Sequence, residues 1–125
     1  MAIEDIFKEV KSASRTILKL GVDRINEIIF FVADEVVNNY EAILEANACD
    51  LARMSPDDPK YDRLKLTRER IEAIAADMRN VARLPSPVGR ELSRSVLPNG
   101  LQLSRVAVPF GVIGVVYEAR SEGVV

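Results

Sequence analysis

The sequence contains one residue that could act as a thiolate nucleophile, Cys49. A catalytic thiol needs a lowered pKa and a neighbouring base, which is most often a histidine. Asp50 follows directly, and a neighbouring carboxylate does not favour a thiolate, while the 125 residues include no histidine. The pattern indicates that Cys49 is an ordinary helix residue, and we expect no catalytic residue in this chain.

Basic side chains gather over residues 60–70 and could face a phosphate group. A solvated loop and helix start explains them more simply, because exposed Lys and Arg are common at such positions. With a single cysteine and no histidine, we expect neither a metal site nor a disulfide. The basic residues are Lys60, Arg63, Lys65, Arg68 and Arg70.

Composition limits the classes of partner. The formal net charge is −2, with 48% hydrophobic and 29% charged residues, which is typical of a folded globular chain. This balance argues against nucleic-acid and membrane partners. No apolar run approaches 18 residues, and the acidic, amphipathic start is unlike a signal peptide. We therefore expect a cytoplasmic protein.

The first two thirds of the sequence predict helices. Apolar residues recur at a spacing of three and four, and Gly21 is suited to stop the first helix. The second helix carries an unusually broad apolar face, which suggests two neighbours. Asn38-Asn39 predicts a break, residues 54–60 a loop, and Thr67 an N-cap. About four helices are expected, over residues 3–20, 23–37, 40–51 and 67–82, with a short helical turn within 61–66.

The chain then changes to β-structure. Pro98-Asn99-Gly100 lies between two short apolar segments and predicts a hairpin, with positive φ available at Asn99 and Gly100. The phase of the apolar residues changes after Leu103, which predicts a bulge or bend near Ser104-Arg105.

Residues 108–116 form the most apolar stretch, rich in β-branched residues and free of charge. A short run of this kind predicts a strand buried on both faces, as in parallel sheets covered by helices. Gly111 and Gly114 resemble part of a dinucleotide fingerprint, but the full spacing is absent and core packing is the alternative. Ligands bind such sheets at the carboxyl ends of strands, which here carry residues 117–120.

At these residues the sequence resembles the γ-glutamyl phosphate reductase (glutamate-5-semialdehyde dehydrogenase) family of the aldehyde dehydrogenase superfamily. The signature is Pro109-Phe110-Gly111-Val112-Ile113-Gly114-Val115-Val116-Tyr117-Glu118-Ala119-Arg120, whose Tyr-Glu-Ala-Arg ending belongs to this branch. The resemblance runs from about Phe7 to Arg120 and includes Leu44-Glu45-Ala46-Asn47-Ala48, Leu66-Thr67-Arg68-Glu69-Arg70-Ile71 and Pro87-Val88-Gly89.

The resemblance implies the N-terminal portion of an NADPH-dependent reductase that converts L-glutamyl 5-phosphate to glutamate 5-semialdehyde in proline biosynthesis. The implied fold class is an α+β fragment of an α/β aldehyde-dehydrogenase-like fold, with about four helices, a hairpin and one buried strand. Tyr117, Glu118, Ala119 and Arg120 are implied to line the cofactor pocket. The family's nucleophilic cysteine lies further downstream, so we expect the 125-residue chain to be inactive and to bind no cofactor alone.

The ending departs from the family, in which Pro-Asn follows the arginine. Ser121 and Glu122 stand there instead, and a carboxylate would oppose an oxyanion that the family's Asn stabilises. The expected organisation is a helical part of the cofactor domain over 1–89, hairpin strands for oligomerisation over 90–108, the first cofactor-domain strand over 109–120, and an atypical ending over 121–125. The resemblance implies a homo-oligomer through the 92–108 hairpin. The alternative is a non-enzymatic helical interaction module.

Overall fold

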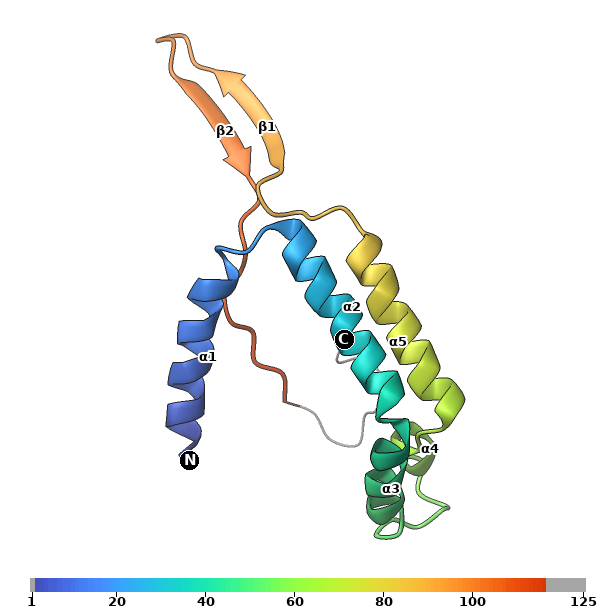
Figure 1. Cartoon of the computed structure of the whole chain (residues 1–125). Helices are drawn as coiled ribbons and strands as arrows, with labels where there is room; N and C mark the ends of the chain where they lie inside the picture. Colours follow the sequence, from blue (N-terminus) through green and yellow to red (C-terminus); the bar gives the residue numbers. More distant parts are fainter. Residues whose placement is uncertain (1, 117–125) are drawn as a thin grey trace. The chain divides into compact units, whose positions relative to one another are not determined.

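The computed structural model describes residues 2–116 (Figure 1). These residues form five helices and one two-stranded antiparallel sheet, which confirms the α+β class. They divide into two compact units, one of residues 2–22 with 84–113 and the other of residues 23–83 with 114–116. The helices are α1 (Ile3–Ile17), α2 (Val22–Asn38), α3 (Tyr40–Leu51), α4 (Tyr61–Leu64) and α5 (Arg68–Arg83), and the strands are β1 (Glu91–Val96) and β2 (Gln102–Val106).

The helical unit is built on α2 and α5, which lie side by side and antiparallel (Figure 1). Asp34 on α2 accepts a 2.6 Å bond from Arg79 on α5, and the guanidinium of Arg83 lies 6.0 Å from the ring centre of Phe30. The buried apolar residues of this unit are Ala33, Ile71, Ala75 and Ala82.

The predicted helix boundaries in this unit are confirmed. Asn39 alone separates α2 from α3, and residues 52–60 form the loop. Thr67 caps α5, because its Oγ1 accepts a 3.2 Å hydrogen bond from the backbone N–H of Arg70, a donor that the first helical turn leaves unpaired.

The hairpin unit confirms the predicted turn. The N–H of Gly100 donates to the carbonyl of Leu97 at 2.8 Å, and Pro98 supplies the fixed φ that the first central position of such a turn requires. Gly100 adopts φ +84°, which a residue with a Cβ rarely tolerates. The Asn99 side chain completes the turn by accepting a 3.1 Å bond from the N–H of Leu101.

The register irregularity lies on the other strand from the one predicted. Glu91 pairs with Val106 and Ser93 pairs with Arg105, so the extra residue is on β1 rather than at Ser104-Arg105 on β2. The prediction named the correct end of the hairpin but the wrong strand, because a change of apolar phase in one strand does not show which partner contributes the additional residue.

Helix α1 is amphipathic and has no buried residue. It ends at Ile17, four residues before the predicted stop at Gly21, and the next residues turn through bonds from Lys19 N–H to Thr16 and from Leu20 N–H to Ile17. These bonds span three residues instead of the four of an α-helix, and they tighten the last turn, as is common at helix ends.

Residues 108–116 do not form the predicted buried strand within the part of the chain that the structure describes. Residues 107–116 form neither strand nor helix, and Val108 and Phe110 are 77% and 97% exposed. A buried strand needs paired neighbours and covering layers, and the described part of the chain contains only two strands, which pair with each other. The hairpin ladder ends at Ala107, whose N–H and carbonyl bond to Arg90 and Gly89.

Candidate functional site

Cys49 lies in α3 with its side chain exposed. No hydrogen bond to its sulfur is found among residues 2–116, and the sequence offers no histidine. The arrangement therefore provides neither a base nor a charge partner that would activate the thiol. Cys49 is placed as the sequence indicated, on a solvent-facing helix position.

Two arginines of the basic cluster act within the fold. Arg68 lies 4.7 Å from the ring centre of Tyr40 and donates to Glu72 at 3.0 Å. The hydrogen bond to Glu72, then the charges of Tyr40 and Glu72, raise the pKa of Arg68 above its ordinary value. These contacts join α5 to α3 and support its first turns, rather than leaving the guanidinium for a phosphate.

Arg70 closes the connection between α4 and α5. Its Nη1 donates to the backbone carbonyls of Asp62 and Lys65, each at 2.6 Å, and its Nη2 lies 3.3 Å from the Asp62 carboxylate. A planar guanidinium with several donors suits this simultaneous bonding to carbonyls and carboxylate. The structure therefore favours the structural interpretation of the basic cluster.

Among residues 2–116, Asn47 is the one buried polar residue, and its residue type and position did not predict its structural role. It is 7% exposed on α3, its Nδ2 donates to the carbonyl of Leu64 at 2.8 Å, and its Oδ1 accepts from the N–H of Leu66 at 2.9 Å. One amide thus satisfies two backbone groups of the α4–α5 connection. Its only sequence signal is an Asn between two alanines within a helix.

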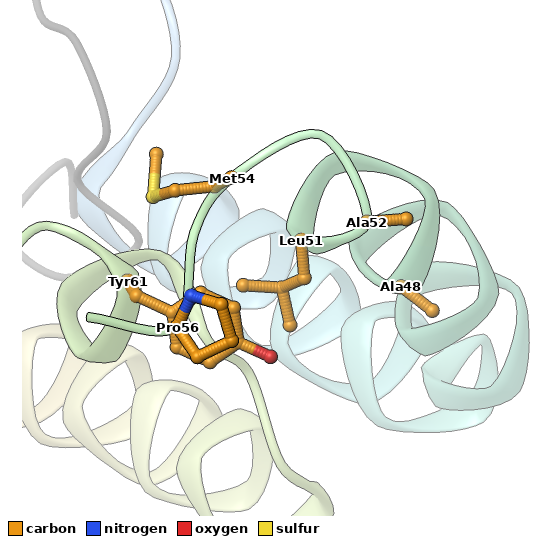
Figure 2. Close-up of a pocket in the computed structure, with 6 residues that line it drawn as sticks. All are labelled: Ala48, Leu51, Ala52, Met54, Pro56 and Tyr61. Atoms are coloured by element: carbon orange, nitrogen blue, oxygen red, sulfur yellow. The ribbon is translucent and has the colours of Figure 1, made fainter. Parts of the chain in front are cut away.

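A shallow apolar hollow of about 460 Å³ lies beside the end of α3 (Figure 2). Apart from the Tyr61 hydroxyl and the Met54 thioether sulfur, the side chains of its lining are apolar, so the hollow suits an apolar side chain. The lining residues are Ala48, Leu51, Ala52, Met54, Pro56 and Tyr61.

The predicted cofactor residues, Tyr117, Glu118, Ala119 and Arg120, lie outside the described residues. Gly111 has φ +100°, and a Cβ built there or at Gly114 meets no atom within 4 Å. Neither glycine is therefore required here by the close approach of another group. Within residues 2–116 no cluster of three acidic, cysteine or histidine side chains could hold a metal, and no helix of that range is long and apolar enough to cross a membrane.

Comparison with known proteins identifies the relatives of this chain. It is 53% identical over 120 residues to the γ-glutamyl phosphate reductase of Bacteroides fragilis, 55% identical over 118 residues to that of Phocaeicola vulgatus, and 50% identical over 120 residues to that of Chlorobium phaeobacteroides. The resemblance to the γ-glutamyl phosphate reductase family is confirmed. No family model matches the chain.

The match covers most of this chain but a minor part of each relative. It takes in 96% of the chain against 29% of the B. fragilis reductase, and 94% against 28% of the P. vulgatus reductase. The chain thus spans less than a third of the length of the curated reductases that it matches, and it is similar to an N-terminal portion of them.

Proposed function

We propose that this chain supplies the N-terminal portion of a reductase that converts L-glutamyl 5-phosphate to glutamate 5-semialdehyde and phosphate in proline biosynthesis. The observation that carries the proposal is an identity of 53–55% to γ-glutamyl phosphate reductases across 91–96% of the chain. The enzyme would be a cytoplasmic oxidoreductase acting on a small-molecule substrate.

NADP(H) is the proposed cofactor of the longer enzyme, in which it supplies the hydride. The described residues do not form a cradle for it, because a Cβ built at either glycine of the 108–116 segment meets no atom of residues 2–116 within 4 Å. No step of the reaction is therefore assigned to residues 2–116. Tyr117, Glu118, Ala119 and Arg120 remain the proposed cofactor contacts.

The proposed division of labour follows the sequence boundaries. Residues 1–89 provide helices of the cofactor domain, residues 90–108 the hairpin, and residues 109–120 the first strand of its sheet, ahead of the atypical residues 121–125. The segment 108–116 supports this proposal, since a charge-free β-branched run suits the centre of a covered parallel sheet.

A chimera tests the proposed function. Residues 1–120 of this chain replace the matching portion of the B. fragilis reductase, and the chimera is expressed in a proline auxotroph that lacks its own reductase. Growth without proline, and NADPH oxidation by the purified chimera, are expected. A folded chimera that supports neither contradicts the proposal, with the unaltered B. fragilis protein as the positive control.

The 125-residue chain by itself is expected to be inactive, because the described residues present no pair of nucleophile and base. Purified chain is incubated with NADPH and freshly prepared glutamyl phosphate, and absorbance at 340 nm is followed. Oxidation above the protein-free control would refute this expectation.

A second candidate function is association through the hairpin, without catalysis by this chain. Both strands have an outer edge that is unpaired within the described residues, and an exposed edge is a template for strand addition. In the longer reductase the same 92–108 hairpin is proposed to join subunits into a homo-oligomer.

Edge-blocking proline variants test this association. The bond between Leu97 and Leu101 sets the alternation of the ladder, which places the N–H groups of Arg94 and Ser104 on the outer edges. The double variant Arg94→Pro/Ser104→Pro is expected to dissociate the oligomer in sedimentation velocity, whereas Arg94→Ala/Ser104→Ala retains it. Equal association of the two double variants would contradict the role of the hairpin.

A further inference from the structure

Residues 111–116 carry no charge, and their large side chains are exposed. No charged residue occurs between Arg105 and Glu118, and the β-branched side chains of this run lie in solvent. Ile113 is 69% exposed, and Val112, Val115 and Val116 are likewise exposed. A monomeric chain in water gains no hydrophobic stabilisation from side chains left in this state.

The backbone of this segment also lacks partners within residues 2–116. After Ala107 no backbone hydrogen bond is formed by the described residues that follow. The chain's own hairpin does not extend to cover them, because Pro87 and Pro109 lie just beyond the last paired residues of the two arms. A proline has no N–H to donate, so the ladder ends there. Pro85 repeats the obstacle on the first arm.

We propose that residues 111–116 form a self-association segment, which pairs with the same segment of further copies of this chain as stacked, in-register β-strands. Six-residue segments with high β-propensity, low net charge, no proline and few glycines are the signature of such packing. Gly111-Val112-Ile113-Gly114-Val115-Val116 has four β-branched residues, no charge and no proline, with glycine at two positions, and Pro109 sets its boundary on one side.

The occupant is a second copy rather than a different protein because in-register stacking places identical residues on one another. Charged side chains would repel in that arrangement, and this segment has none. Each added copy pairs the free N–H and carbonyl groups of the previous one and covers the same valines and isoleucine. The segment carries no charged or hydrogen-bonding side chain that would select a particular foreign partner.

This inference does not depend on the proposed reductase function. In a longer protein that supplies neighbouring strands, the same residues would be paired and covered, and the segment would not be available. Association of this chain and activity of the chimera are therefore separate outcomes, and one can fail while the other holds.

The test follows the full 125-residue chain at several concentrations with thioflavin T fluorescence, and examines the product by fibre diffraction. The parent chain is expected to form open-ended assemblies with the reflection near 4.7–4.8 Å that stacked strands give. Ile113→Lys places a charge in every layer and is expected to lengthen the lag phase at least about tenfold. Val88→Lys is the matched control, because Val88 is 55% exposed and lies outside the segment.

Retention of the parent's lag phase by Ile113→Lys would overturn the proposal. A parent chain that stays monomeric would also overturn the proposal. So would a parent chain that forms only closed oligomers without the strand-spacing reflection, because such oligomers would form through another surface. Circular dichroism of both lysine variants confirms that the helices persist, so that a change in lag phase is attributed to the segment.

Discussion

Asn47 is predicted to be the most sensitive polar position of the helical unit. Asn47→Ala removes the hydrogen bonds to the Leu64 carbonyl and the Leu66 N–H, at 2.8 and 2.9 Å. Both backbone groups are half-buried, so water replaces these bonds only in part. At about 1 kcal/mol for each lost bond, the loss is about 2 kcal/mol. The better helix propensity of alanine returns about 0.5 kcal/mol, which leaves a net destabilisation of about 1.5 kcal/mol.

Urea denaturation of the full chain, followed by circular dichroism at 222 nm, measures this loss. A small protein has a denaturant slope of about 1 kcal/mol/M, so the midpoint is expected to fall by about 1.5 M with the slope unchanged. Asn80→Ala is the matched control, because Asn80 is an exposed helix residue whose bond to Arg83 is 3.3 Å long. Equal midpoints for the two variants would refute the role assigned to the Asn47 amide.

Asn47→Asp separates hydrogen bonding from packing, since it nearly preserves the shape of the side chain. One carboxylate oxygen of the aspartate accepts the hydrogen bond from the Leu66 N–H. The other oxygen faces the Leu64 carbonyl, to which the Asn47 amide donates in the parent chain. Only the protonated acid can donate there, so its folded-state pKa is raised above the unfolded value of about 3.9. The variant is therefore most stable below about pH 4 and loses that stability as pH rises through the raised value. A midpoint, relative to Asn47→Ala, that is the same at pH 3.5 and pH 7 would contradict this account.

Three further outcomes are expected. Gly100→Ala forces a Cβ into φ +84° and destabilises the hairpin by about 1–2 kcal/mol, seen as weaker NMR contacts across the strands, whereas Gly21→Ala leaves them intact. Hydrogen bonds from the backbone N–H of Glu69 and from the Thr67 hydroxyl lower the pKa of the Glu69 carboxyl. The ionised carboxylate therefore stabilises the fold above its unfolded-state pKa, and this stabilisation is lost as the pH falls through the lowered folded-state pKa. An NMR titration of Glu69 with an ordinary midpoint would contradict this expectation. Cys49 is labelled completely by Ellman's reagent in the native chain, because its side chain is exposed, and labelling only after unfolding would show that it is covered.

The sequence predicted the features that short stretches of chain determine. A turn needs Pro98 and Gly100 within a few residues, and a helix cap needs Thr67 three residues before the N–H that it accepts from. Both interactions close within the local backbone, so residue type and spacing are sufficient to place them. The break at Asn39 follows the same logic.

The Asn47 contacts could not be predicted in this way. The amide bonds to residues 17 and 19 positions away, and the path between them passes through a loop whose course the residue types do not determine. A helical Asn is ordinarily interpreted as a solvent-facing residue or a helix end. Only the placement of the α4–α5 connection against α3 shows that its side chain substitutes for missing backbone partners.

The segment 108–116 shows why apolar composition alone does not make a buried strand. Its residue types match those of a strand in a covered sheet. A strand is stabilised by hydrogen bonds to a neighbouring strand, however, and the described residues form no such bonds beyond Ala107. The prolines at positions 85, 87 and 109 end the one ladder that reaches it. The same sequence is therefore consistent with two states, a buried strand where neighbouring strands are supplied and an exposed, self-pairing segment where they are not. Which state forms is decided by the partners of the segment and not by the segment itself.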